Sequence, residues 1–191
     1  MFLGLRKTAP EGISPRHVNL HTLRNWCGAG ILTHHRTMST EFMNRAIALA
    51  HANIRAGGGP FAALIVRDGR VVAQGTNQVT SANDPTAHAE VVAIREACKA
   101  LATFQLTGCD LYTSCEPCPM CLGAIYWARP ARVFYAGTAA DAAAAGFDDA
   151  FIYEEIKLSQ TARRIPMAQL LHQEGIGIFK AWNAKTDKTP Y

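Results

Sequence analysis

Two short stretches decide the architecture of this chain: His88-Ala89-Glu90 and, further on, Pro117-Cys118-Pro119-Met120-Cys121. They provide one imidazole and two thiols, the side chains that a borderline-soft ion such as zinc prefers. A structural zinc site uses four protein ligands, whereas a catalytic site uses three and leaves one position open for water. Three ligands and a nearby carboxylate therefore predict a hydrolytic zinc enzyme in which Glu90 moves protons.

The helix that carries the cysteines is predicted to begin at Pro117. Proline is favoured at a first helical position, and Cys118 and Cys121 then share one face of the opening turn. The positive end of a helix favours their thiolate forms. Cys115 also forms a Cys-x-x-Cys pair with Cys118, but it precedes the proline, so we predict a neighbour of the site and not a ligand. Glu116 is interpreted as a first-turn charge that the helix dipole favours.

A second helix is predicted to begin at Asp84, shortly before His88. Asp84 precedes Pro85, which gives a capping side chain followed by a proline. His88 and Glu90 are two residues apart and would point to different sides of a helix interior. We therefore expect the metal near the end of this helix, where Glu90 can reach the open position. Both helix starts then converge on one ion.

The surrounding sequence alternates between strand and helix patterns. Helical apolar spacing begins at Glu41 and ends at residues 57–60, and Asp68-Gly69 indicates a hairpin between strands at 61–66 and 71–73. The order predicts an α/β fold, a three-layer α/β/α domain with a central mixed sheet of about five strands and both metal-bearing helix starts at one sheet edge. The remaining expected elements are strands at residues 109–114, 132–136 and 165–171 and helices at residues 117–130, 139–145 and 176–182.

Composition limits the class of protein. With 191 residues and 49% hydrophobic content, the chain can bury the core of one ordinary domain. No apolar run approaches the roughly 18 residues of a membrane span, and no segment has the pattern of a secretory signal. We therefore expect a cytoplasmic protein whose six cysteines are reduced.

Charge is concentrated at the N-terminus. The first forty residues hold five basic side chains and one acidic one, which accounts for the whole net charge of +4. Residues 1–38 are interpreted as a basic extension, disordered or appended, and residues 39–191 as the zinc-dependent domain. Met38, before the capping residues Ser39 and Thr40, is the favoured natural start. A transit peptide and a nucleic-acid-binding arm are less favoured alternatives.

The joint pattern resembles the cytidine deaminase superfamily and, within it, the bacterial guanine deaminases. The resemblance covers about residues 41–191, and Ala62 departs from it where glycine is expected. It implies a cytidine deaminase-like fold, a Zn²⁺ cofactor and the hydrolysis of guanine to xanthine and ammonia, with Glu90 shuttling protons. The matching segments are residues 58–61 (Gly-Gly-Pro-Phe), 83–90, 112–130, 146–149 (Gly-Phe-Asp-Asp) and the terminal Tyr191.

The same resemblance implies the roles of individual side chains. The metal ligands would be His88, Cys118 and Cys121, and His88 would also face the substrate. Five further residues would contact the purine or its leaving group. They are Phe61, stacking on the ring; Asn77, hydrogen-bonding it; Trp127, walling the pocket; Asp149, a second acid for the amino group or leaving ammonia; and Tyr191, a lid. Without the resemblance, the first four would be read as core, turn or helix-cap residues.

The resemblance also implies a homodimer in which the C-terminal segment crosses to the partner and Tyr191 covers its active site. A purine base is the expected small-molecule partner, with no membrane and no nucleic acid, because the domain itself is neutral. Guanosine, another nucleobase or adenosine in tRNA are alternative substrates. A zinc-stabilised binding module without catalysis is the remaining alternative, and it would need a fourth ligand such as Cys115.

Overall fold

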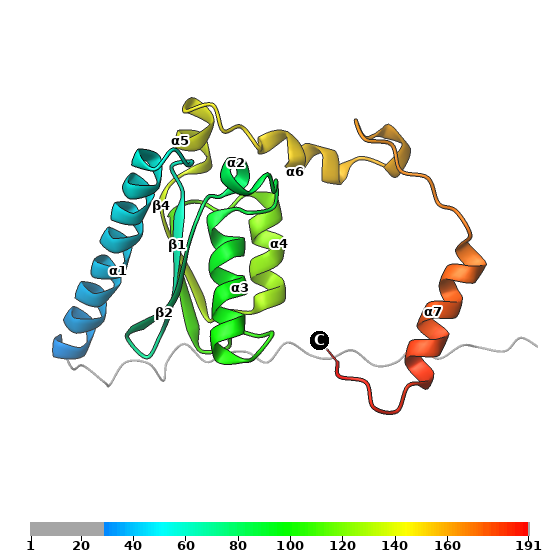
Figure 1. Ribbon diagram of the computed structural model, residues 1–191, viewed down its shortest axis with the longest axis horizontal. Coiled ribbons are helices and arrows are strands. Elements are labelled where there is room, and N and C mark those ends of the chain that lie inside the picture. The colour runs from blue at the N-terminus through cyan, green and yellow to red at the C-terminus, as the bar shows by residue number, and fades with distance from the viewer. Residues whose placement is uncertain (1–28, 191) are drawn as a thin grey trace, which may run out of the picture.

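A computed structural model describes residues 29–190, with side chains from residue 39 onward (Figure 1). Helices and strands alternate along most of this length, as the sequence predicts. In chain order the elements are α1 (Ala29–Arg55), β1 (Ala62–Arg67), β2 (Arg70–Thr76), α2 (Val79–Ala82), α3 (Ala89–Leu101), β3 (Cys109–Cys115), α4 (Pro119–Ala128), β4 (Arg132–Gly137), α5 (Ala139–Ala144), α6 (Ala150–Lys157), a 3₁₀ turn (Gln160–Ala162) and α7 (His172–Ala184).

The described strands form one mixed sheet in the order β2-β1-β3-β4. β1 is antiparallel to both β2 and β3, whereas β3 and β4 are parallel. The predicted hairpin at Asp68-Gly69 is confirmed, since these residues join β1 to β2. Because β3 and β4 are parallel, the segments that follow them begin at the same edge of the sheet.

The sheet has four strands, and the predicted fifth strand at residues 165–171 is wrong. This segment is neither helix nor strand in the structure. Pro166 has no N–H group to donate to a strand ladder. Figure 1 also shows the chain beyond α5 leaving the body of the domain, so the segment lies away from the sheet that it would have to extend.

The metal-bearing helices begin later than predicted. α3 begins at Ala89, with His88 as the extended residue before it, and not at Asp84. The Asp84 carboxylate instead accepts hydrogen bonds from the backbone N–H and hydroxyl of Thr86 at 2.8 and 2.7 Å, which closes a local turn. The histidine thus lies at the helix end, as expected from its spacing to the glutamate.

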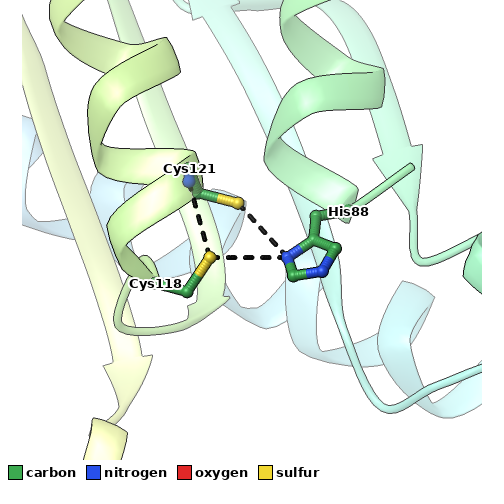
Figure 2. Close-up of side chains that lie close together, drawn as sticks. All are labelled: His88, Cys118 and Cys121. Atoms are coloured by element: carbon green, nitrogen blue, oxygen red, sulfur yellow. Dashed lines mark hydrogen bonds between the residues drawn. The ribbon is translucent and has the colours of Figure 1, made fainter. Parts of the chain in front are cut away.

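The second of these helices begins at Pro119 and not at Pro117. Cys118 is the extended residue before α4, and its sulfur accepts a hydrogen bond from the backbone N–H of Cys121 at 3.4 Å. Proline at the first helical position is confirmed, but the proline is the one after Cys118. Figure 2 shows that the start of this helix and the start of α3 face each other.

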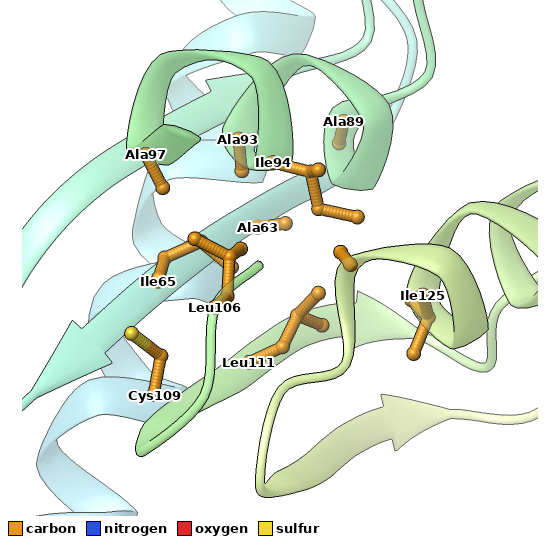
Figure 3. Close-up of a cluster of buried hydrophobic side chains, with 11 residues drawn as sticks. Ala63, Ile65, Ala89, Ala93, Ile94, Ala97, Leu106, Cys109, Leu111 and Ile125 are labelled. Atoms are coloured by element: carbon orange, nitrogen blue, oxygen red, sulfur yellow. The ribbon is translucent and has the colours of Figure 1, made fainter. Parts of the chain in front are cut away.

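Helices cover both faces of the sheet, which confirms the three-layer α/β/α class. Side chains of β1 alternate, so that Leu64 and Val66 pack with Phe42 of α1 on one face. Ala63 and Ile65 point to the other face. They pack there with residues of α3, the following loop, β3 and α4 (Figure 3): Ala89, Ala93, Ile94, Ala97, Leu106, Cys109, Leu111, Ile125 and Ala128.

The first described helix starts earlier than the apolar pattern predicts. α1 begins at Ala29, so the predicted domain boundary after residue 38 falls inside it, and Ser39 and Thr40 are not helix caps. The Ser39 hydroxyl instead lies 3.3 Å from the hydroxyl of Tyr112 on β3. Residues 1–28 of the predicted extension lie outside the described residues.

The C-terminal segment extends away from the three layers. Figure 1 shows α6 and α7 reaching outward from α5. Many of its large apolar side chains are exposed, including Ile165 at 82% and Phe179 at 69%. The expected surface helix after β4 and the short helix near residues 176–182 are confirmed as α5 and α7. None of the described helices is long and apolar enough to cross a membrane.

α3 lies unusually close to β2 at Gly75. A Cβ atom at this position would meet the carbonyl oxygen of Ala89 and the backbone nitrogen of Ala93. Backbone atoms cannot rotate aside as a side chain can. Glycine therefore allows α3, and with it His88, to approach the sheet.

Gly75→Ala is expected to lower the free energy of unfolding by about 1–3 kcal/mol, because it overpacks this contact. Gly123→Ala is the matched control, since an added Cβ meets nothing within 4 Å in α4. It should instead raise the free energy of unfolding by about 0.5–1 kcal/mol through the higher helix propensity of alanine. Urea denaturation of both zinc-loaded variants measures the difference. Equal stability of Gly75→Ala and the unmodified protein would contradict the close packing.

Candidate active site

Three potential ligands come together where α3 and α4 begin. His88 precedes α3, Cys118 precedes α4, and Cys121 lies in the first turn of α4. Both cysteine sulfurs lie 3.5 Å from Nδ1 of His88 (Figure 2). The three ligand atoms are within 4.8 Å of one another, so one ion can contact all of them.

The geometry fits zinc. Bonds of about 2.3 Å to sulfur and about 2.0–2.1 Å to nitrogen in a tetrahedron separate the donor atoms by about 3.5–3.8 Å. The observed nitrogen-to-sulfur distances of 3.5 Å agree with this separation. One imidazole and two thiolates are also a donor set that zinc prefers over calcium or magnesium. The three side chains therefore fit a zinc cofactor and could hold it as protein ligands.

The pKa values of the two thiols differ. Hydrogen bonds that Cys118 accepts from Cys121 and from His88 lower the pKa of its thiol to about 4. The same contact with Cys118, together with burial, raises the pKa of Cys121. The hydrogen bond to Cys118 raises the pKa of His88. Cys118 is thus a thiolate at neutral pH, and a bound metal ion would displace the remaining proton from Cys121.

The Glu90 carboxyl group is buried beside the ligands, with only 6% of the residue exposed. Its Oε1 accepts a hydrogen bond of 2.9 Å from the Thr113 hydroxyl, and its Oε2 lies 3.4 Å from the sulfur of Cys121. Burial raises the pKa of Glu90. A raised pKa makes the carboxylate a better proton acceptor, and its place beside the ligand cluster suits it to proton transfer there.

A cavity of about 530 Å³ opens onto this cluster. His88, Glu90, Cys118 and Cys121 line it. Of the other predicted site residues, the structure brings Phe61, Asn77 and Asp149 to the same cavity.

Trp127 does not line this cavity. It is six residues beyond Cys121 on α4, which turns it to a different side of the helix from the metal ligands. The residue is 65% exposed and lines a second cavity of about 400 Å³ with Ile94 and Phe104. Within one chain, the structure thus places Trp127 outside the cavity that the metal ligands line. Tyr191 lies outside the described residues.

Asn53 at the end of α1 joins two loops that border the cavity. Its side-chain amide donates hydrogen bonds to the carbonyl oxygens of Gly59 at 2.8 Å and Asn77 at 3.0 Å. The Asn77 side-chain oxygen accepts a hydrogen bond from the backbone N–H of Val79 at 3.3 Å. The NH₂ group of the same side chain remains a hydrogen-bond donor.

Asp149 precedes α6, but its side chain does not cap this helix. The neighbouring Asp148 carboxylate accepts the hydrogen bond from the backbone N–H of Ala150 at 3.0 Å. Burial, and secondarily the negative charge of Cys118, raise the pKa of Asp149. The carboxyl group of Asp149 is thus close enough to the metal ligands to sense their charge.

Sequence reasoning did not assign a site role to Phe147 or Glu116, which also line the cavity. The ring of Phe147 meets that of Phe61 edge to face, with centroids 4.9 Å apart. The Glu116 carboxylate accepts a hydrogen bond of 3.0 Å from the backbone N–H of Ala139 and so joins the metal loop to α5. No local sequence pattern marks these two residues, because they reach the cavity through the parallel pairing of β3 and β4.

Cys115 lines the cavity but is not part of the three-residue cluster found among the described residues. Its thiol donates a hydrogen bond of 3.6 Å to the carbonyl oxygen of Thr138. Burial raises the pKa of this thiol, which disfavours the thiolate form that zinc binds.

Comparison with known proteins agrees with this geometry. Residues 36–137 match the family described as the cytidine and deoxycytidylate deaminase zinc-binding region. The chain is 58% identical to guanine deaminase of Bacillus subtilis (strain 168) over 151 residues, which are 78% of this chain and 97% of the relative. The crystal structure of guanine deaminase from Bacillus subtilis matches with a TM-score of 0.78 at 57% identity, over 80% of this chain and 98% of that one.

Two further relatives match over a smaller part. A structure of guanine deaminase from Nitrosomonas europaea has a TM-score of 0.55 at 38% identity and covers 56% of this chain and 63% of that one. A tRNA-specific adenosine deaminase of Agrobacterium fabrum (strain C58 / ATCC 33970) is 45% identical over 96 residues, 50% of this chain and 63% of the relative.

His88→Ala, Cys118→Ala and Cys121→Ala are each expected to lose most bound zinc, because two protein ligands are left to hold the ion. Cys115→Ala is the matched control and should keep one zinc per chain. Inductively coupled plasma mass spectrometry of dialysed proteins gives the metal content. Loss of zinc from Cys115→Ala would make Cys115 a fourth ligand and favour a closed structural site.

Proposed function

Because the chain belongs to the cytidine and deoxycytidylate deaminase zinc-binding family, we propose that it is a guanine deaminase, which hydrolyses guanine to xanthine and ammonia. The observation that carries this proposal is the match to guanine deaminase of Bacillus subtilis, which spans 97% of that relative. The match to the tRNA-specific adenosine deaminase spans only half of this chain. The substrate class is therefore a free purine base.

The reaction exchanges one bond at the purine carbon that bears the amino group. A carbon–oxygen bond forms with water, the carbon–nitrogen bond breaks, and the amine leaves as ammonia after it gains a proton. A bound zinc ion supplies the means to activate water at neutral pH. Glu90 takes the proton at Oε2, the carboxylate oxygen beside the ligand cluster, and delivers it to the leaving amine.

The cavity suits a flat base with polar edges. We assign ring stacking to Phe61, with Phe147 supporting it edge to face. The NH₂ group of Asn77 donates a hydrogen bond to an acceptor on the purine, because its oxygen is already used by Val79. Asp149 accepts a hydrogen bond from an amino group of the base or from departing ammonia. His88 also lines this cavity.

We further propose that the C-terminal segment crosses to a second copy of the chain, where Tyr191 covers the active site. Two observations support this proposal. The segment carries exposed apolar side chains on α6, α7 and the connection between them, such as Phe151, Ile165 and Phe179. Exposed apolar surface of this kind is typical of a protein–protein interface. A second, largely apolar cavity also lies between α3 and α4.

Thiolate ligands require reduced cysteines, which agrees with the expected cytoplasmic location.

Ammonia release from guanine, guanosine, cytosine, adenine and ammeline tests the substrate. Guanine is expected to react fastest with the zinc-loaded protein. Faster release from guanosine would keep the chemistry but reassign the pocket, and release from none of the five would move the search to adenosine in tRNA, the substrate of the other branch of the family.

Glu90→Gln is expected to keep its zinc and its fold but to lose at least about 10²-fold in kcat, because the amide cannot accept and return a proton. Steady-state ammonia release and zinc content are measured on the same preparation. A zinc-loaded Glu90→Gln protein with unchanged kcat would contradict the role of Glu90.

Removal of residues 185–191 is expected to lower guanine turnover while bound zinc stays constant, because the tail and not the metal cluster is changed. Sedimentation velocity checks whether the dimer also weakens. The single change Tyr191→Ala is the matched control, and it should lower turnover without dissociating the dimer. Full turnover by the truncated protein would exclude the lid.

A further inference from the structure

Thr113 lies on β3 and contacts the carboxyl group of Glu90, 23 residues earlier in the chain. We propose that Thr113 is a positioning residue that holds Oε1 of Glu90, so that Oε2 alone faces the reacting centre. The inference rests on the proposed function only in that Glu90 transfers the proton. It concerns which residue orients the carboxyl group of Glu90.

The contact is buried and direct. The Thr113 residue is fully buried, and its hydroxyl donates to Oε1 at 2.9 Å. The second carboxylate oxygen, Oε2, lies on the side of the ligand cluster, 3.4 Å from the sulfur of Cys121. The two oxygens of one carboxyl group therefore have different surroundings, one held by the sheet and one facing the metal ligands.

The last torsion of a glutamate side chain has a broad, nearly two-fold energy profile, so its carboxyl plane turns readily unless it is held. A hydrogen bond to one oxygen fixes this torsion and thereby the direction of the other oxygen. Reactions that move a proton depend steeply on such alignment. Thr113 thus limits the motion that would turn Oε2 away from the base.

Thr113 is itself well fixed. It belongs to a central strand, where it is paired with Ala63 of β1 on one side and Tyr135 of β4 on the other. Its branched Cβ restricts the side-chain torsion that aims the hydroxyl. Glu90 lies in the first turn of α3. Its hydrogen bond to Thr113 therefore joins the helix that follows His88 to the strand that leads to the cysteines. The sheet sets the direction of the proton-transferring oxygen.

Thr113→Val tests the proposal, because valine keeps the shape of threonine and removes only the donor. We expect kcat to fall about 10–100-fold, the usual range when a partner of a site residue is lost, with KM changed less than about 2-fold. Thr113→Ser, which keeps the hydroxyl, should recover kcat to within about 3-fold of the unmodified protein. Zinc content and circular dichroism are measured for each protein.

Ser114→Ala is the matched control. The Ser114 hydroxyl accepts a hydrogen bond of 3.1 Å from the backbone N–H of Ala62 and does not contact Glu90. Its loss should affect stability without a selective fall in kcat. A Thr113→Val protein that is folded and zinc-loaded but has unchanged kcat would overturn the proposal. Equal losses in the serine and valine variants would overturn it as well, since they would point to packing.

An infrared measurement without substrate separates this proposal from the proposed function. The carboxyl band of Glu90 is assigned from the difference spectrum against Glu90→Gln. It should shift in Thr113→Val and return in Thr113→Ser. An unshifted band would overturn the positioning role even if guanine is deaminated. Failure of the unmodified protein to release ammonia from any base would instead refute the proposed function, whatever the band does.

Discussion

The structure depends on one geometric requirement: an imidazole and two thiolates must meet within a few ångströms at a single point. His88 comes from the start of α3, and both sulfurs come from the start of α4. These helix starts can meet only if both helices lie on the same face of the sheet and begin at the same edge. The pairing of β1 with β3 and the close approach of α3 to β2 at Gly75 meet this requirement.

The zinc cluster could be predicted from sequence because the imidazole and thiols are chemically distinctive, the two cysteines are three residues apart, and Glu90 follows His88 by two. The hairpin at Asp68-Gly69 was equally predictable, since those residues favour one short turn. Helix starts were less predictable, because Asp84 and Pro117 have the right residue types but belong to turns that precede α3 and α4. A capping side chain that finds a local partner looks the same in sequence as one that opens a helix.

The rest of the cavity depends on contacts between distant segments. Phe147 and Glu116 reach the site because β3 and β4 are parallel neighbours, a fact that no local pattern contains. Trp127 shows the opposite case, because closeness to Cys121 in sequence did not bring it to the cavity. The predicted strand at residues 165–171 failed for a related reason: apolar residues alone do not provide a neighbouring strand to pair with.

The ligand cluster also has a consequence for the chain as a polymer. His88 and Cys118 are separated by 30 positions in the sequence, and a metal ion bound to both would join them as a cross-link. A cross-link of this span removes loop-closure entropy from the unfolded ensemble, as a disulfide does. A metal cross-link differs from a disulfide because its contribution to stability depends on the concentration of the ion and not on the redox state of the surroundings. The same atoms that prepare the site for chemistry thus make the folding equilibrium a function of zinc availability.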